Sequence, residues 1–314
     1  MEKVKDMRWQ EGITASELVE MLRRAGFQGT VLARAADVIA DMKRNNAKIY
    51  LSFTSNMVTS GLRGLFAQMI RLGLADVVVT TTGGIEEDIM KAMGEDFLIG
   101  QYHPDDLSLH EKGTNRIGNL LIRNESYIRF EDAVLPMIMK VYEKKKRIAT
   151  NELLREIGLM LDDEDSILYQ SARKGVPVFC PAIADGSLGF QLHIFQQDHP
   201  DFVVDTIKDY SEMISSSTFD DRKGVIALGG GVSKHFAIFG LLLNGGCDYA
   251  VYMTTSHSYS GSVGGATTSE GKTWGKVKVD ADEVTVIGDV SITFPLVMAR
   301  AMDIMKKEGL LGDG

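Results

Sequence analysis

Two amphipathic helices are predicted at the start of the chain from the spacing of its apolar residues. Thr14 and Glu17 have the spacing of a capping box, which marks the start of the first helix, and Gly26 marks its end. A second helix follows and ends at the polar pair Asn45–Asn46. Its apolar face consists of Leu32, Ala35, Ile39 and Met42. We therefore expect a helical hairpin ahead of the first strand.

Short apolar runs alternate with helical patterns along the rest of the chain. Strands are expected at residues 48–54, 76–80, 178–180, 225–228, 249–253 and 284–287. Helical periodicity is found at residues 60–73, 86–93, 151–160, 166–174, 202–215, 234–243 and 294–307. Uninterrupted apolar strands are typical of a parallel sheet that helices cover on both faces. The pattern therefore predicts an α/β fold with a doubly wound, mostly parallel sheet.

The length of the chain sets its domain organisation. Its 314 residues are enough to bury one large hydrophobic core. No repeat, low-complexity tract or evident linker interrupts the alternation of strands and helices. We expect an N-terminal helical extension at residues 1–46 and one large domain at residues 47–314.

Composition and charge narrow the class of protein. Apolar residues make up 44% of the chain, and no apolar run approaches the roughly 18 residues of a membrane-spanning helix. The charged N-terminus lacks the apolar core of a signal peptide, so we expect a cytoplasmic protein. A formal charge of -9 argues against nucleic-acid binding and favours a cationic partner. Cys180 and Cys247 lie in apolar stretches, so we expect both to be small, buried side chains and not part of a disulfide or a metal site.

Small residues follow three of the predicted strands, at residues 52–61, 80–84 and 229–231. Ligands of open α/β sheets bind beyond the carboxyl ends of the strands, where small residues let backbone N–H groups approach a phosphate. Strand-to-helix geometry alone would explain any one of these turns, and none has the G-x-G-x-x-G pattern. Three of them in one sheet favour a dinucleotide site.

Glu86 and Glu87 are predicted to open the helix after the second strand. Acidic residues in a first turn complement the helix dipole, which is a sufficient structural reason for them. In the functional interpretation they face the same cleft as the glycine-rich turns, where carboxylates bind hydroxyl or ammonium groups.

Lys276 is the candidate nucleophile. Lys276, Lys278 and Asp280 alternate with valines, which is also typical of an edge strand with one polar face. Lys276 stands beside Trp274 and Gly275, however. A lysine in an apolar, aromatic-lined cleft has a lowered pKa and forms imines, so the spacing permits a covalent role.

Several short strings of residues occur in order along the chain. They are Thr54-Ser-Asn56, Ser60-Gly-Leu-Arg63, Gly83-Gly-Ile-Glu-Glu-Asp88, Asn115-Arg-Ile-Gly-Asn119, Asp185-Gly-Ser-Leu-Gly189, Gly229-Gly-Gly-Val-Ser-Lys-His235, Asp248-Tyr-Ala-Val-Tyr252 and Trp274-Gly-Lys276. Each alone is unspecific, but together, over residues 50–295, the sequence resembles the deoxyhypusine synthase family. This resemblance implies a Rossmann-like NAD-binding topology for the large domain.

NAD is the cofactor that the resemblance implies. The residues expected to hold it are Ser55, Asn56, Met57, Val58, Thr59, Thr81, Thr82, Gly83, Glu87, Asp185, Gly230, Thr255, Ser256, Asp289 and Val290. Members of the family are homotetramers with active sites at subunit interfaces, so we expect a homotetramer.

The resemblance also implies an aminobutyl transfer. Hydride transfer from spermidine to NAD is followed by loss of diaminopropane and capture of the four-carbon amine as an imine on Lys276. The group then passes to one lysine of a translation factor precursor, and the retained NADH reduces the new imine. The residues expected to meet the amine are Glu86, Glu87, His235, Glu270 and Trp274. His235 would remove a proton during amine oxidation, unless it is only a polar residue at a helix start.

The chain departs from the family pattern at positions that would bind the polyamine. Phe190 and Phe239 stand where the family has an aspartate and an asparagine, and Ser260 and Val263 stand where it has two acidic residues. Each lost charged hydrogen bond weakens the binding of the distal ammonium by about 1–3 kcal/mol. Either other residues compensate, for which Gln191 and His257 are candidates, or the donor or acceptor differs.

Three functions are therefore open. The first is deoxyhypusine synthesis on a protein lysine, which the ordered motifs and Lys276 favour. The second is a related transfer to a small amine such as putrescine, or from another donor such as agmatine, which the departures favour. The third is a non-catalytic protein that binds NAD.

Overall fold

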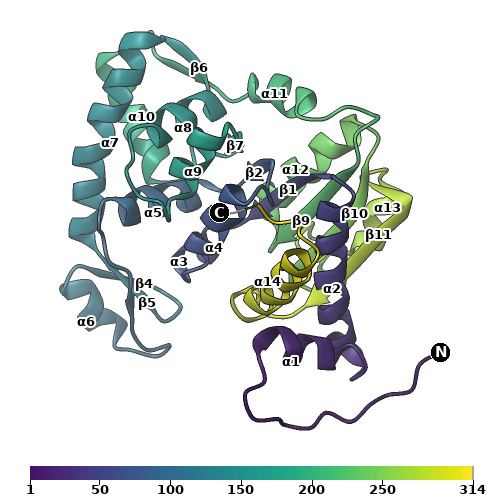
Figure 1. Cartoon of the computed structure of the whole chain (residues 1–314). Helices are drawn as coiled ribbons and strands as arrows, with labels where there is room; N and C mark the ends of the chain where they lie inside the picture. The colour runs from purple at the N-terminus through teal and green to yellow at the C-terminus, as the bar shows by residue number, and fades with distance from the viewer. Residues whose placement is uncertain (313–314) are drawn as a thin grey trace. The chain divides into compact units, whose positions relative to one another are not determined.

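The computed structural model describes residues 1–312 and divides into two compact units (Figure 1). The first unit comprises Met1–Thr54, Arg71–Val79 and the chain from Tyr210 on. The second comprises Ser55–Ile70 and Thr80–Asp209. Residues 1–46 lie in the first unit, and their status as a separate extension stays a prediction.

Parallel strands form the centre of the first unit. They are β1 (Lys48–Phe53), β2 (Val77–Val79), β9 (Lys223–Leu228), β10 (Cys247–Thr254) and β11 (Val277–Ile287). They lie in the order β11-β10-β9-β1-β2, and every neighbouring pair is parallel. β9 is buried along its whole length, which is why its residues 225–228 form an uninterrupted apolar run rather than an alternating one. The predicted α/β fold with a mostly parallel sheet is confirmed.

Helices α2 and α14 lie side by side in this unit (Figure 1). The helices of the unit are α1 (Ala15–Leu22), α2 (Phe27–Arg44), α12 (Gly231–Leu243), α13 (Thr268–Thr273) and α14 (Val290–Lys307), with a 3-10 turn η1 (Ser258–Ser260). A further helix, α11 (Asp209–Ser215), begins at the last residue of the second unit.

Helices cover both faces of the sheet. Met42 of α2 packs where a side chain on Gly224 of β9 would lie. Tyr252 of β10 pairs with Ala227, which points to the opposite face from Gly224 because side chains alternate along a strand. Lys234 of α12 lies over the Tyr252 ring. Since α2 and α12 therefore contact opposite faces, the sheet is doubly wound, as predicted.

The second unit is mostly helical. Its helices are α3 (Ser55–Thr59), α4 (Arg63–Arg71), α5 (Thr82–Ala92), α6 (Asp106–Glu111), α7 (Asn124–Lys144), α8 (Thr150–Gly158), α9 (Ile167–Lys174) and α10 (Ser187–Asp198), with Arg71 belonging to the first unit. Its strands are β3 (Leu98–Ile99), β4 (Thr114–Ile117), β5 (Leu120–Arg123), β6 (Arg147–Ala149), β7 (Val178–Phe179) and β8 (Val203–Asp205). β3, β5 and β4 form an antiparallel sheet, and β6 pairs with β8 in parallel.

Local predictions were partly confirmed: the start of α1 was right, but the helix ends at Leu22, and Gly26 directly precedes α2 instead of ending α1. The Thr14–Glu17 capping box starts α1. The predicted helix over residues 202–215 was wrong at β8, because residues 203–205 pair with β6 and only α11 is helical. Cys180 and Cys247 are free and buried, as expected. Among the described residues, no helix is both long and apolar enough to cross a membrane.

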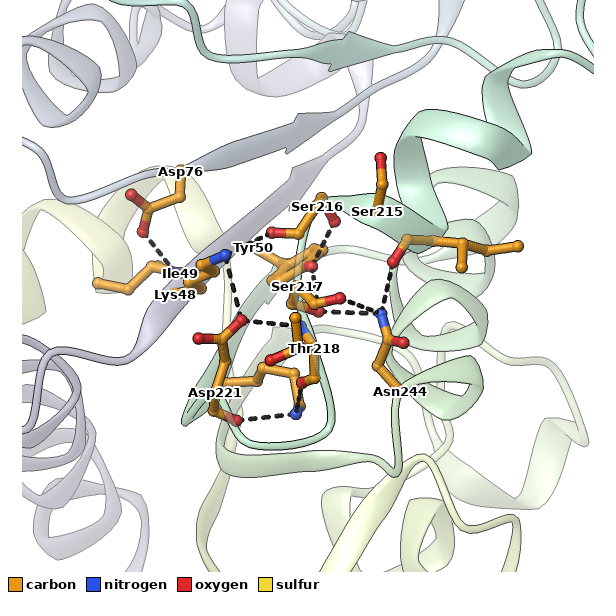
Figure 2. Close-up of polar contacts among 12 residues, drawn as sticks. Lys48, Ile49, Tyr50, Asp76, Ser215, Ser216, Ser217, Thr218, Asp221 and Asn244 are labelled. Carbon is orange, nitrogen blue, oxygen red and sulfur yellow. Dashed lines mark hydrogen bonds and ion pairs between the residues drawn. The ribbon is translucent and has the colours of Figure 1, made fainter.

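The loop between α11 and β9 is tied to the amino ends of β1 and β9 (Figure 2). The Asn244 Nδ2 donates to the carbonyl oxygens of Ile214 and Ser217 at 2.8 and 2.9 Å. Tyr50 Oη donates to Ser217 Oγ at 2.9 Å. The buried Lys223 ammonium donates to two carbonyl oxygens of the same loop. Buried polar groups satisfy each other here, so this edge of the sheet has a structural role.

We expect Asn244→Ala to lower the free energy of unfolding by about 2–3 kcal/mol, because it leaves buried carbonyl groups without donors. Urea denaturation measures the change. The matched control is Ser215→Ala at the last residue of α11, whose hydroxyl donates to the Glu212 carbonyl oxygen of the same helix and points away from the network (Figure 2). Equal effects of the two substitutions would contradict the role assigned to Asn244.

Candidate active site

The carboxyl ends of three parallel strands meet at one edge of the sheet in the first unit. The Gly229 N–H donates to the carbonyl oxygen of Met253 at 2.8 Å, and the Gly288 N–H donates to that of Thr254 at 3.0 Å. The residues that follow β9, β10 and β11 therefore lie along this edge. They include five of the predicted cofactor residues, Gly230, Thr255, Ser256, Asp289 and Val290.

Glycine at position 230 is required by a close backbone approach. A Cβ atom on Gly230 would lie 2.2 Å from the Cα of Gly264. Gly230 immediately precedes α12, and Asp289 caps α14 by accepting from the Ser291 N–H at 2.8 Å. Two helices thus begin at this edge, one of them from a turn without side chains. Such a turn fits the phosphates of a dinucleotide.

The predicted cofactor residues of the second unit also lie together, on α3 and the start of α5. A Cβ atom on Gly83 would lie 2.8 Å from Ser55 Cβ, so the two helices touch there. The Ser55 N–H donates to Thr81 Oγ1 at 3.2 Å, and Thr59 Oγ1 donates to Glu87 at 2.5 Å. The residues brought together are Ser55, Asn56, Met57, Val58, Thr59, Thr81, Thr82, Gly83 and Glu87.

The placement of Glu86 and Glu87 corrects one expectation. α5 begins at Thr82, because Thr81 is still extended, so both glutamates lie beyond the first turn. Complementing the helix dipole is therefore not the reason for them. Glu86 is buried and accepts from the Leu188 N–H at 3.1 Å, at the start of α10. Asp185, another predicted residue, is exposed just before that helix.

Burial raises the pKa of both glutamates. The pKa of Glu87 rises to about 7, although the Thr59 hydrogen bond and the charge of Lys91 oppose the rise. The pKa of Glu86 is also raised by burial, with the backbone N–H groups at the start of α10 opposing. Each carboxylate is therefore ready to accept a cationic partner, since its charge is poorly solvated.

Lys276 lies in the first unit, immediately before β11. The predicted edge strand is confirmed from Val277 on, and Lys278 pairs there with Asp248 at 2.7 Å. Lys276 itself is not part of that polar face, because its side chain is buried with 8% of its surface exposed. Its Nζ lies 4.8 Å from the centre of a Trp274 ring. Burial lowers the pKa of Lys276, as a nucleophilic amine requires.

His235 lies on α12, in the same unit. Its ring stacks on Phe239 with centroids 6.0 Å apart and an angle of 13°. Burial and the charge of Lys276 lower its pKa, which favours the neutral form. Phe239, one of the departures from the family pattern, thus forms an apolar wall for the histidine. Of the other predicted amine-binding residues in this unit, Glu270 on α13 is exposed and Trp274 is half-buried.

The remaining departures lie at the surface or in loops. Phe190 is 58% exposed on α10. Ser260 donates to the carbonyl oxygen of His257 at 2.9 Å, within the loop that also carries Val263. Gln191 is buried and donates to Glu131 at 3.2 Å. Compensation by Gln191 or His257 stays a prediction.

Arg63 and Asp88, both part of the quoted motifs, form a buried ion pair in the second unit. Arg63 Nε donates to Asp88 at 2.6 Å, and another guanidinium nitrogen donates to Asp163 at 2.6 Å. Asp88 also accepts from Ser166 Oγ and from backbone N–H groups at the start of α9. This network fixes α5, and with it the two glutamates, against α9.

The sequence interpretation missed Lys234. It is 1% exposed on α12, next to His235, and belongs to the Gly229–His235 string. The only signal was its place in that string, because the periodicity of the helix did not distinguish it from a solvated lysine.

Comparisons with known proteins agree with the motifs. The family model of deoxyhypusine synthase matches residues 17–301. The protein named probable deoxyhypusine synthase in Thermococcus kodakarensis is 36% identical, over 94% of this chain and 92% of the relative. Its namesake in Schizosaccharomyces pombe is also 36% identical, over 92% of this chain and 87% of the relative. The crystal structure of a provisionally assigned deoxyhypusine synthase from Entamoeba histolytica is 26% identical, with a TM-score of 0.70 over 96% of this chain and 97% of that one.

We expect Glu87→Gln to change how stability depends on pH. Because the pKa of Glu87 is about 7 in the folded protein and about 4.5 when unfolded, the folded state holds an extra proton between these values. Its contribution to stability is therefore complete below pH 4.5 and is lost as the pH rises through 7. Between pH 5 and pH 8, the free energy of unfolding of Glu87→Gln should therefore fall by up to about 3 kcal/mol less than that of the wild type.

Urea denaturation at the two pH values measures this change. Glu111→Gln, at an exposed carboxylate on α6, is the control and should leave the pH dependence unaltered. A Glu87→Gln variant that loses as much stability as the wild type between pH 5 and pH 8 would argue against the raised pKa.

Proposed function

Because this chain belongs to the deoxyhypusine synthase family, whose members are transferases that carry out hypusine-forming aminobutyl transfer, we propose that it moves the 4-aminobutyl group of spermidine to a lysine of a translation factor precursor. In this proposal the group is carried as an imine on Lys276, and NAD is the cofactor. The observation that carries the proposal is the burial of the Lys276 amine beside Trp274.

An imine forms only from an uncharged amine, and burial supplies one. The ammonium form of Lys276 loses its hydration in the buried site, so its pKa falls. The free amine attacks the oxidised carbon of the substrate, and 1,3-diaminopropane leaves as the four-carbon group becomes bonded to Lys276. The indole of Trp274 keeps water from this imine.

Glutamates in each unit are proposed to bind ammonium groups of the substrate. Glu86 and Glu87 are buried in the second unit, and Glu270 is exposed in the first. An ammonium group bound to Glu87 would favour its ionised form and would lower its pKa from about 7. The binding of the amine should therefore release protons near neutral pH.

NAD is proposed to bind at the glycine turns. Gly230 in the first unit and Gly83 in the second each occupy a position where a side chain would collide with a neighbouring residue, so only glycine fits at either turn. A bound NAD would supply the hydride acceptor for oxidation of the amine and the hydride donor for reduction of the product imine. His235, whose lowered pKa favours the neutral ring, is proposed to remove the amine proton.

The acceptor is the least constrained part of the proposal. Phe239 and Val263 replace polar residues of the family pattern, which favours a small amine acceptor or a donor other than spermidine as the second candidate. A homotetramer and a cytoplasmic location stay predictions.

Borohydride reduction of a mixture of the protein, NAD and spermidine should leave a four-carbon adduct on Lys276, which peptide mass spectrometry locates. Lys276→Arg should form none, because a guanidinium is not deprotonated to attack. Lys278→Arg is the matched control, since Lys278 is ion-paired with Asp248 and should leave adduct formation unchanged.

The acceptor is then identified by adding one component at a time. Transfer of labelled aminobutyl groups to the translation factor precursor supports deoxyhypusine synthesis. Transfer to putrescine, or an adduct from agmatine, supports the second candidate. An absence of adduct with every amine, alongside an active deoxyhypusine synthase, would overturn the covalent role of Lys276.

A further inference from the structure

Lys234 is a buried lysine with few partners. Only 1% of its surface is exposed. Its Nζ donates to the carbonyl oxygen of Ala266 at 2.8 Å and lies 4.0 Å from the centre of the Tyr252 ring. A lysine ammonium has three donors, so one carbonyl oxygen and one aromatic face leave it poorly compensated for lost hydration.

These two contacts join the parts of the first unit that carry the candidate catalytic residues. Lys234 is adjacent to His235 on α12, and Ala266 immediately precedes Thr267, which caps α13 by accepting from the Glu270 N–H at 3.1 Å. Lys276 follows α13, and its backbone N–H donates to the carbonyl oxygen of Gly271. The Lys234 ammonium thus holds the start of the segment that ends at Lys276 against α12, the helix that carries His235.

Tyr252 contributes to the same arrangement. Its hydroxyl is buried and has no hydrogen-bond partner within residues 1–312. A Cβ atom on Gly271 would lie 3.4 Å from that hydroxyl and 2.9 Å from Val277. Only a glycine lets α13 pack this closely, so the ring that Lys234 contacts is also in contact with the segment that ends at Lys276.

A hydrogen bond that holds two segments together does not need a charged donor. A neutral donor or an apolar side chain would avoid the cost of burying an ammonium group. Burial lowers the pKa of Lys234 to about 8, while Glu270 raises it and the charge of Lys276 lowers it further. Repulsion between two cations is mutual, so the Lys234 charge opposes protonation of Lys276 in return.

We propose that Lys234 is a positioning residue of the aminobutyl transfer, which holds the Lys276 segment against the His235 helix and uses its charge to keep the Lys276 amine unprotonated. The proposal rests on the function proposed above. The titratable groups that act on Lys234 within this unit are Tyr252 from β10, Glu270 from α13 and Lys276, while His235 follows it on α12. Of these groups, Glu270 alone carries a negative charge, and its side chain is exposed to solvent.

Three substitutions separate the hydrogen bond that Lys234 donates from the charge that it carries. Lys234→Met removes both, Lys234→Gln keeps a hydrogen-bond donor without the charge, and Lys234→Arg keeps both. Lys272→Met is the matched control, because it removes a lysine of α13 that is paired with Glu283 at 3.5 Å. Circular dichroism checks that each variant is folded, and two measurements then follow.

The first measurement needs no substrate. Limited acetylation with acetic anhydride over pH 6–10, read by mass spectrometry, reports the protonation of Lys276 in the free protein. In Lys234→Met and Lys234→Gln we expect the midpoint of Lys276 labelling to rise by about one pH unit, which is tenfold less free amine at pH 7. Lys234→Arg and Lys272→Met should keep the wild-type midpoint.

The second measurement is borohydride trapping of the four-carbon adduct over the same pH range. Trapping in Lys234→Gln should fall about tenfold at pH 7 and recover near pH 9, because the missing charge acts only through the proton on Lys276. A loss of trapping by the same factor at every pH, with an unchanged labelling midpoint, would mean a purely structural role and would overturn the electrostatic part of the proposal.

The two measurements also distinguish this inference from the proposed function. If the wild type gives no adduct at any pH but the labelling midpoint still depends on the charge at position 234, the transfer fails and the coupling of the two lysines stands. If the wild type forms the adduct and the midpoint is the same in all folded variants, the transfer stands and the role of Lys234 is wrong. If Lys234→Met does not fold, Lys234→Gln and Lys234→Arg give the same comparison.

Discussion

Both units bury ionisable groups where water cannot solvate their charges. In the first unit, burial lowers the pKa values of Lys234 and Lys276, so that both amines approach the neutral form. In the second unit, burial raises the pKa values of Glu86 and Glu87. A neutral amine can attack a carbon, and a poorly solvated carboxylate gains most from a cationic partner. The proposed chemistry depends on this loss of hydration.

The fold supplies the burial by joining rigid elements at a few close contacts. Gly230 packs against Gly264, and Gly271 packs between Tyr252 and Val277, at distances that leave no room for a side chain. The opposite edge of the sheet, at the amino ends of β1 and β9, is held by the Asn244 network and carries none of the predicted ligand residues. In the second unit the Arg63–Asp88 pair holds α5. Rigid packing of this kind keeps a buried amine from reaching water.

Predictions from the sequence were most accurate where the pattern is local. The strands of the parallel sheet, the capping box of α1 and the apolar face of α2 were all recognised. α7 was not predicted as a helix, although it is longer than any other described helix, because Pro136 and charged residues interrupt its apolar spacing. β8 was taken for the start of a helix because its pairing with β6 involves residues distant in the sequence. The start of α5 was placed too late, which led to a dipole explanation for Glu86 and Glu87 that the structure excludes.

By itself the sequence determined the family and the fold class, because ordered motifs and buried strands leave local signatures in residue type and spacing. It also identified Lys276 and His235 as candidates. Only the tertiary structure decided that Lys276 is buried rather than part of the polar face of an edge strand, that Phe239 stacks on His235 and that Lys234 lies beneath the same segment. The reason is physical: the hydration of a side chain, and therefore its pKa, depends on neighbours that packing brings from distant parts of the chain.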